Sequence, residues 1–183
     1  MYDTGPDPSY MTAEELAGVS WPDKVTELVR GRVVVHEPPG TRHGSIASRL
    51  TYYLGDFVYR NRLGVVFAQD TGFHIASDPD TVRAPDVAYL AESRAAAVQD
   101  RGYARTAPDL VAEIVSPDDR PAEVRAKVRD WLTAGVKLVW VIDPRGRVAD
   151  VHRPDGTVVE GARQLSGEDV LSGFRCEVDD LLL

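Results

Sequence analysis

The sequence predicts an α/β (α+β) protein, with a mixed β-sheet flanked by helices in a single domain. Three observations favour this class. The chain has 183 residues, which is enough for one domain of ordinary size. Strand-like segments outnumber long helices, and residues 109–142 run strand, helix, strand. That order is typical of a sheet covered by helices, and it argues against a helical bundle or a β-sandwich.

The N-terminal residues divide into a leader and the start of the folded domain. Residues 1–11 are rich in proline and aspartate, which is typical of a flexible, frayed leader or of an arm that becomes ordered only on a partner. Thr12 and Glu15 have the spacing of a capping box, so a short helix is expected to begin there and to end at Gly18. The folded domain is therefore expected over residues 12–183.

Strand and helix patterns follow one another through the rest of the chain. Residues 24–36 alternate in polarity and are rich in valine around Arg30-Gly31, which indicates two strands joined by a tight turn. Apolar side chains recur every three or four residues over 42–60, as in an amphipathic helix. Further strands are expected at 65–69, 72–76, 84–90, 109–116, 137–142 and within 148–159. Shorter helices are expected at 92–99 and 121–134.

The charge balance limits the classes of function. Lysine and arginine number 21 against 29 aspartate and glutamate, which gives a net charge of −8 and an isoelectric point near 5.0. Such a field repels polyanions and argues against non-specific coating of nucleic acid, yet it allows an enzyme that gathers carboxylates around a cation. Cys176 is the single cysteine, so no intrachain disulfide or zinc knuckle is expected. No signal peptide or membrane span is predicted, and a cytoplasmic location is expected.

Two acidic residues stand where the pattern predicts strands. Glu113 lies among apolar residues, where an ionised carboxylate requires a metal ion, a catalytic lysine or a structural arginine as its partner. Asp86 begins another strand, where it either serves a ligand site or accepts a hydrogen bond within a local turn. Two carboxylates on neighbouring strands can share a hard divalent cation such as Mg²⁺. Lys127 lies on the edge of the next helix's apolar stripe, where it either faces the sheet or pairs with Glu123 at the surface.

The motif Pro85-Asp86, followed by Glu113 and a lysine in the next helix, resembles the signature of the PD-(D/E)XK nuclease superfamily. Val115 stands where the lysine of that signature is usual, and Lys127 would take over its role. Over nearly its whole length the chain is similar to the bacterial Uma2 family of restriction-endonuclease-like proteins. The stretches that carry this resemblance are TELVRGRVVV, RAPDVAYL, PDLVAEIVSP and KVRDWLTAGVKLVWVIDP. Departures from the family pattern stand at Gly44, Trp131 and Leu138.

The resemblance implies a restriction-endonuclease-like core with a site for a metal ion and a phosphate. Asp86 and Glu113 would bind Mg²⁺ or Mn²⁺, and the main-chain carbonyl of Ile114 would add a third ligand. Lys127 would lie beside the attacked phosphate. In phosphodiester hydrolysis a metal ion polarises a phosphoryl oxygen and lowers the pKa of a bound water, while a lysine orients that water or neutralises developing charge.

Two further residues match recurrent positions of the family. Glu27 is a candidate additional acidic ligand, although glutamates on hairpins are usually solvated. His43 is a candidate group for binding phosphate or handling a proton, although a histidine near the start of a helix often only hydrogen-bonds to the backbone. The sequence leaves both alternatives open for each residue.

The resulting hypothesis is a metal-dependent endonuclease that hydrolyses DNA phosphodiester bonds. One alternative is a catalytically inactive module of the same fold that binds nucleic acid or another partner, and a further one is hydrolysis of another phosphate ester. A DNA enzyme needs a basic face, which a net charge of −8 does not supply, so a local cleft or a homodimer would have to supply it. Most arginines in the middle of the chain are expected to pair with acids: Arg30, Arg32, Arg42, Arg49, Arg60, Arg62, Arg83, Arg101, Arg105, Arg120, Arg125 and Arg129.

Overall fold

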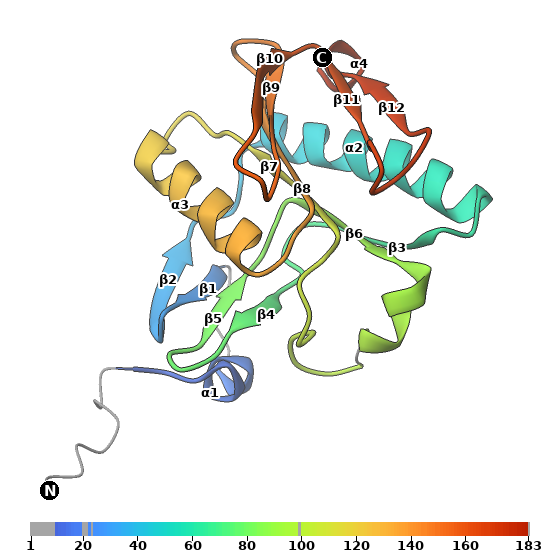
Figure 1. Ribbon diagram of the computed structural model, residues 1–183. Helices are drawn as coiled ribbons and strands as arrows, with labels where there is room; N and C mark the ends of the chain where they lie inside the picture. The colour runs from blue at the N-terminus through green and yellow to red at the C-terminus, as the bar shows by residue number, and fades with distance from the viewer. Residues whose placement is uncertain (1–9, 20–21, 23, 99, 183) are drawn as a thin grey trace, which may run out of the picture.

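The architecture is a mixed α+β domain in which helices flank β-sheets, as the sequence predicts (Figure 1). The computed structural model describes residues 10–19, 22, 24–98 and 100–182. Within these ranges the strands form a six-stranded, a four-stranded and a two-stranded sheet. The helices are α1 (Ala13–Gly18), α2 (Thr41–Arg60), α3 (Pro121–Thr133), α4 (Val178–Leu181) and the 3₁₀ helix η1 (Glu92–Ala97). No helix of the described residues is long and apolar enough to cross a membrane.

The six-stranded sheet forms the centre of the domain, with the strand order β10-β9-β8-β7-β6-β3. Its strands are β3 (Gly64–Phe67), β6 (Val87–Ala91), β7 (Leu110–Ile114), β8 (Leu138–Asp143), β9 (Val148–His152) and β10 (Val158–Ala162). Strands β7 and β8 are parallel and are connected through α3, whereas the other neighbours in the sheet are antiparallel. This parallel pair with its helix is the expected strand, helix, strand unit.

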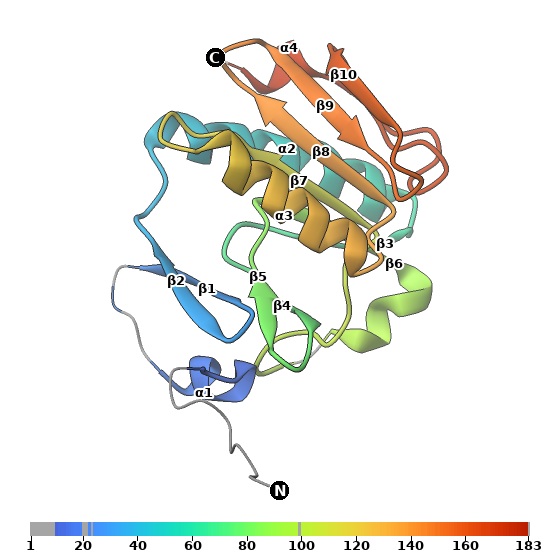
Figure 2. The same cartoon turned by 60° about the vertical axis from the view of Figure 1, so that its left-hand side comes forward.

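Helices α2 and α3 cover opposite faces of this sheet (Figure 2). Successive residues of a strand point to opposite faces. Leu110 of β7 belongs to the same buried cluster as Leu50 of α2, whereas Val111 belongs to that of Val128 on α3. Because helices cover both faces, β7 is apolar along almost its whole length. Glu113 is the exception, and by alternation it lies on the face that α3 covers.

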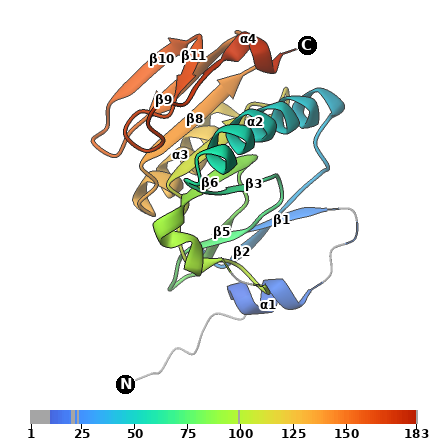
Figure 3. The same cartoon turned by 90° about the vertical axis from the view of Figure 1, so that its right-hand side faces the viewer.

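The four-stranded sheet and α1 lie at the end of the molecule opposite to β9 and β10. Figure 3 shows β1, β2 and α1 below and β9 and β10 above. The order of the four-stranded sheet is β2-β1-β5-β4, and its strands are β1 (Val25–Val29), β2 (Arg32–His36), β4 (Phe73–Ala76) and β5 (Thr81–Arg83). Leu16 of α1 is buried in one cluster with Leu28 of β1. The predicted capping box is confirmed, because the Thr12 hydroxyl accepts the Glu15 N–H at 3.2 Å and the Glu15 side chain accepts the Thr12 N–H.

The structure corrects the strand predicted over 84–90, which begins only at Val87, and it adds β5, which the sequence did not predict. Strand β5 ends at Arg83 in the four-stranded sheet, and β6 begins at Val87 in the six-stranded sheet. Pro85 has no N–H to donate to a ladder and is excluded from the middle of a central strand, so the chain leaves one sheet and enters the other here. Asp86 therefore lies at the junction of the two sheets.

The two ends of the chain complete the fold. Strands β11 (Gln164–Ser166) and β12 (Arg175–Glu177) form the two-stranded sheet near the C-terminus. Residues 1–9 of the expected leader lie outside the described residues. Its last two residues contact the β1–β2 hairpin: the Met11 N–H donates to the Gly31 carbonyl at 2.7 Å, and the Arg32 guanidinium lies 5.7 Å from the centroid of the Tyr10 ring.

Candidate active site

The register of β6 and β7 brings Asp86 and Glu113 together. In this antiparallel pair Val87 lies opposite Ala112, so the next position along places Asp86 opposite Glu113. Residues that lie opposite each other direct their side chains to the same face of a sheet. The Asp86 carboxylate reaches the neighbouring strand, where its Oδ2 accepts the N–H of Ile114 at 2.7 Å. Asp86 therefore directly precedes β6 and Glu113 lies on the adjacent strand β7, close enough for the negative charge of Asp86 to act on Glu113.

Glu113 is 7% exposed and has two donors, both on α3. The indole Nε1–H of Trp131 donates to Oε1 at 2.7 Å, and the Lys127 ammonium donates to Oε2 at 3.4 Å. Burial, together with the negative charges of Asp86 and Glu27, raises the pKa of Glu113 to about 7 against the opposing effects of Lys127 and Trp131. Without a metal ion, burial and the neighbouring negative charges therefore outweigh the two donors and disfavour the ionised form of Glu113.

Lys127 lies between two carboxylates and faces the sheets. Its Nζ is 3.4 Å from Glu113 Oε2 and 3.6 Å from Glu27 Oε1, and the side chain is 26% exposed. The surface pair with Glu123 does not form; Glu123 instead lies 3.8 Å from Arg120. Burial lowers the pKa of Lys127, but the carboxylates of Glu113 and Glu27 outweigh it and the net effect is a raised pKa. Lys127 is therefore a permanent cation in this site.

Glu27 is almost fully buried, at 1% exposure, and it is not solvated on the hairpin. Its Oε2 accepts from Arg83 Nη1 at 2.8 Å and lies 3.2 Å from His36 Nε2, and its Oε1 accepts the Ala84 N–H at 3.0 Å. Burial acts to raise the pKa of Glu27, but the His36 hydrogen bond and the charges of Lys127 and Arg83 lower it to about 2. The carboxylate is therefore ionised at neutral pH.

His43 lies in the first turn of α2 and touches the same strand end. Its Nε2 lies 3.0 Å from the Ile114 carbonyl oxygen and 3.2 Å from Asp86 Oδ2, and its Nδ1 lies 3.1 Å from Gln69 Nε2. Since a carbonyl only accepts, Nε2 carries the proton, and Nδ1 of the neutral ring can accept from Gln69. Burial lowers the pKa of His43, but Asp86 and the carbonyl outweigh it and raise the pKa overall. The expected hydrogen bond to the backbone is present, together with a contact to Asp86.

Sequence reasoning did not anticipate three groups at this site. Gln69 follows β3 and its amide Nε2 lies 3.3 Å from Asp86 Oδ1. The sequence marks Trp131 only as a departure from the family pattern, yet it is one helical turn from Lys127, and a buried indole N–H usually has a partner. Arg83 donates through Nε to Asp130 Oδ2 at 3.0 Å while it binds Glu27. Of the three, Trp131 could have been found from the sequence, because a buried Glu113 requires a hydrogen-bond donor and the indole N–H is one.

The residues present fit a hard divalent cation. Four carboxylates and two permanent cations form the cluster: Glu27, Asp86, Glu113, Asp130, Arg83 and Lys127. When all are ionised, four negative charges against two positive leave an excess of two, the charge of one such ion. Among the described residues no group of three His, Cys, Asp or Glu side chains could hold a metal ion. An ion here would have the Asp86 and Glu113 carboxylates, the Ile114 carbonyl and several waters as ligands, which suits Mg²⁺.

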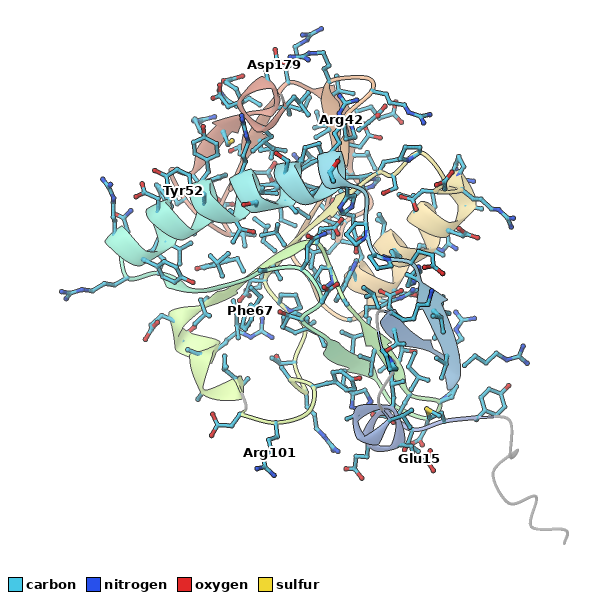
Figure 4. All side chains as sticks on the ribbon, turned by 180° about the vertical axis from the view of Figure 1, so that it is seen from behind. Glu15, Arg42, Tyr52, Phe67, Arg101 and Asp179 are labelled. Atoms are coloured by element: carbon cyan, nitrogen blue, oxygen red, sulfur yellow. The ribbon has the colours of Figure 1, made fainter. Side chains whose placement is uncertain are left out.

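Fewer of the arginines in the middle of the chain form ion pairs than the sequence analysis predicts. Of the twelve in the middle of the chain, ion pairs with described acidic residues are made by four: Arg60, Arg83, Arg105 and Arg120. The prediction that most are paired is therefore wrong for the described part of the chain, because many of the acids are engaged with the backbone or with other cations. The remaining arginines do not form a single patch, since Arg42 and Arg101 lie at opposite ends of the molecule (Figure 4).

A pocket of about 610 Å³ lies between α3 and the four-stranded sheet, next to the cluster. Arg30 and Arg129 line it, and so do Arg83 and Asp130, which form one ion pair of the cluster. The candidate metal ligands and Lys127 do not line it. The pocket is therefore adjacent to the candidate active site and is not part of it.

Comparison with known proteins places this fold among nuclease-like α+β domains. A crystal structure of a putative nuclease of DUF820 from Anabaena variabilis ATCC 29413 is similar, with a TM-score of 0.79 and 21% identity over 93% of this chain and 97% of that chain. At this identity the likeness establishes the fold. The model of Uma2, described as a putative restriction endonuclease, matches residues 13–179, and the chain belongs to the Uma2 family. The resemblance seen in the sequence is confirmed, and a nuclease-like function is supported. No curated protein matches the chain.

Proposed function

We propose that the protein is a metal-dependent endonuclease that hydrolyses DNA phosphodiester bonds. The observation that supports this proposal is the proximity of Asp86 and Glu113, in a cluster with an excess of two negative charges, beside a lysine that is held as a cation. A site with that composition attracts a divalent cation and can present it and an ammonium to the same phosphate.

The chain's own residues would divide the work as follows. Asp86, Glu113 and the Ile114 carbonyl would hold Mg²⁺ or Mn²⁺. When bound, the ion would polarise a phosphoryl oxygen and lower the pKa of a coordinated water. Lys127 would neutralise negative charge that develops on the phosphate in the transition state; as a protonated group it cannot act as the base. Trp131 would keep the Glu113 carboxylate oriented through its hydrogen bond at 2.7 Å.

His43 would support the ligands and need not contact the substrate. Its ring lies against both Asp86 Oδ2 and the Ile114 carbonyl oxygen, and Gln69 contacts both the ring and Asp86. Partners that orient the ligands of a metal ion tune its affinity even when they do not bind it. His43 and Gln69 would therefore fix the Asp86 carboxylate and the carbonyl before the ion arrives.

Cleavage of plasmid and linear DNA with Mn²⁺ or Mg²⁺ tests the proposal. Asp86→Asn, Glu113→Gln and Lys127→Met are each expected to reduce the rate by about 100-fold or more, because each removes a charge at the reacting phosphate. Glu123→Gln is the matched control: it makes the same change as Glu113→Gln on the exposed side of α3, and the rate should not change. Equal activity of wild type and Glu113→Gln would refute the proposal. Metal-independent DNA binding without any cleavage would favour the inactive module instead.

A further inference from the structure

We propose that Glu27 is a positioning residue that fixes both Lys127 and the segment carrying Asp86, a role that rests on the proposed nuclease function. The sequence alone made Glu27 a candidate metal ligand. The contacts of its two oxygens assign it a different task, in which one buried carboxylate sets the geometry of groups on both sheets and on α3.

The acceptor positions of Glu27 are filled by the protein itself. A carboxylate offers about four lone-pair positions. Oε2 faces Arg83 Nη1 at 2.8 Å and His36 Nε2 at 3.2 Å, while Oε1 faces the Ala84 N–H at 3.0 Å and Lys127 Nζ at 3.6 Å. With four positively polarised groups around it and 1% of its surface exposed, Glu27 has no oxygen lone pair directed at an open ligand position.

The contact between Glu27 and Lys127 restricts the position of the lysine ammonium. Lysine is a point charge on a flexible four-carbon chain, so a single partner does not fix its position. Here the ammonium lies between Glu113 of the six-stranded sheet and Glu27 of the four-stranded sheet. The two carboxylates approach from different sheets and restrict the ammonium to the space between them.

The hydrogen bond between Glu27 and Ala84 fixes the segment that carries Asp86, the candidate metal ligand. Ala84 belongs to the link between the sheets, two residues before Asp86. Its N–H donates to Glu27 Oε1, so the same oxygen that faces the lysine also holds the backbone of the link. Displacing this carboxylate would therefore move the lysine and the start of the Asp86 segment together.

An ion-pair relay fixes Glu27 to the helix that supplies the lysine. Arg83 binds Glu27 through Nη1 and Asp130 through Nε, and Asp130 lies on α3 one turn after Lys127. The contacts from Lys127 to Glu27, Arg83 and Asp130 thus form a closed loop through α3. Removing one partner of such a buried pair leaves uncompensated charge, so the loop holds its geometry firmly.

The inference is tested with Glu27→Gln, in which the side chain keeps its size and loses its charge. Glu37→Gln is the matched control, because Glu37 directly follows the same hairpin, is exposed and pairs with Lys24. The ¹⁵Nζ signals of the lysines report the ammonium directly, and assignment is simple because the chain has few lysines: Lys24, Lys127 and Lys137. Mn²⁺ affinity is measured on the same samples by electron paramagnetic resonance, without DNA.

We expect Glu27→Gln to lose the protected ¹⁵Nζ signal of Lys127 and to lower kcat by about 100-fold, the cost of a misplaced catalytic group. Mn²⁺ affinity should fall far less than in Glu113→Gln, because the amide oxygen of the new side chain can still accept the Ala84 N–H and only one charge of the cluster is lost. Glu37→Gln should change none of the three. A loss of Mn²⁺ affinity as large as that of Glu113→Gln would overturn the inference and make Glu27 a ligand. An unchanged Lys127 signal would overturn it too.

Glu27→Asp keeps the test decisive where Glu27→Gln does not fold. It retains the charge and withdraws the carboxylate by one methylene, so we expect a folded protein with a weakened Lys127 signal, a partial loss of kcat and a Mn²⁺ affinity that falls far less than in Glu113→Gln. A Lys127 signal as strong as in the wild type would contradict the positioning role. The lysine and metal measurements need no DNA cleavage, so a protein that never cleaves would refute the nuclease proposal and leave the effect of Glu27 on Lys127 measurable.

Discussion

The hydrogen bond from Trp131 to Glu113 can be isolated because the protein contains a natural counterpart. Trp131 and Trp140 are both 0% exposed. Each packs on a phenylalanine, Phe73 at 6.4 Å and Phe174 at 5.8 Å between ring centroids. The indole N–H of Trp131 donates to Glu113, whereas that of Trp140 is buried with no hydrogen-bond partner among the described residues. Replacing each tryptophan by phenylalanine therefore makes the same change in two settings that differ in this bond.

The two substitutions are expected to change the free energy of unfolding by different amounts and in different directions. Both substitutions leave a void smaller than one ring, which costs on the order of 1 kcal/mol. Trp131→Phe also removes a hydrogen bond to a charged group, worth roughly 1.5–3 kcal/mol, so the total is about 2.5–4 kcal/mol. Trp140→Phe removes an unpaired buried N–H, whose desolvation costs roughly 1–3 kcal/mol, and this gain offsets the void. We expect its net effect to lie between no change and a stabilisation of about 2 kcal/mol.

Urea unfolding followed by circular dichroism measures both variants. The difference between them should be larger well above the Glu113 pKa of about 7 than well below it, because the bond is stronger when the carboxylate is ionised. Equal destabilisation by the two substitutions, at either pH, would refute the reasoning that the Trp131 N–H stabilises an otherwise poorly compensated carboxylate. A similar m-value for all proteins is required for the comparison to hold.

Three further predictions follow from the charges at and around the site. Because Glu113 must lose its proton to bind a cation and has a pKa of about 7, Mn²⁺ affinity should rise about tenfold per pH unit up to that pKa and then level off, with no such rise in Glu113→Gln. In the metal-free protein the raised pKa means that the folded state binds the Glu113 proton more tightly than the unfolded state does. The contribution of Glu113 to the free energy of unfolding is therefore complete below its ordinary pKa of 4.5 and is lost as the pH rises through 7. Denaturant titrations at several pH values across this range measure whether the free energy of unfolding falls in this way. Arg125 and Arg129 are exposed on α3, two positions before and after Lys127, so replacing both by alanine should weaken DNA binding and reduce its salt dependence by about two counterions, whereas Arg62→Ala just beyond the C-terminal end of α2 should not.

The site could be read from the sequence in part, through residue types that conflict with their local pattern. Glu113 interrupts an apolar strand, and a charged residue at a position where the local pattern expects an apolar one indicates a functional site. Asp86 was found because Pro85 precedes it, although the sequence placed both within one strand. Lys127 was placed at the edge of the helix stripe, where it does face the sheet. These three residues lie together in the structure.

Other parts of the site had no signal in the sequence. Gln69 is an ordinary polar residue at the end of a strand, and nothing in its surroundings along the chain marks it. Arg83 and Asp130 are 47 positions apart, and their pairing depends on how α3 crosses the four-stranded sheet. Glu27 was recognised as notable from family position alone, and its task could not be derived, because the hairpin pattern is compatible with either a solvated or a buried side chain.

The sequence by itself determined the class of fold, the parallel strand pair with its helix, and the two carboxylates proposed as metal ligands, because local periodicity and buried charge are properties of short stretches of chain. The tertiary structure decided the division of the strands between two sheets, the direction in which Lys127 points and the partners of Glu27. These depend on contacts between residues far apart in the chain. The energy of such contacts depends on burial and distance, which no local pattern encodes.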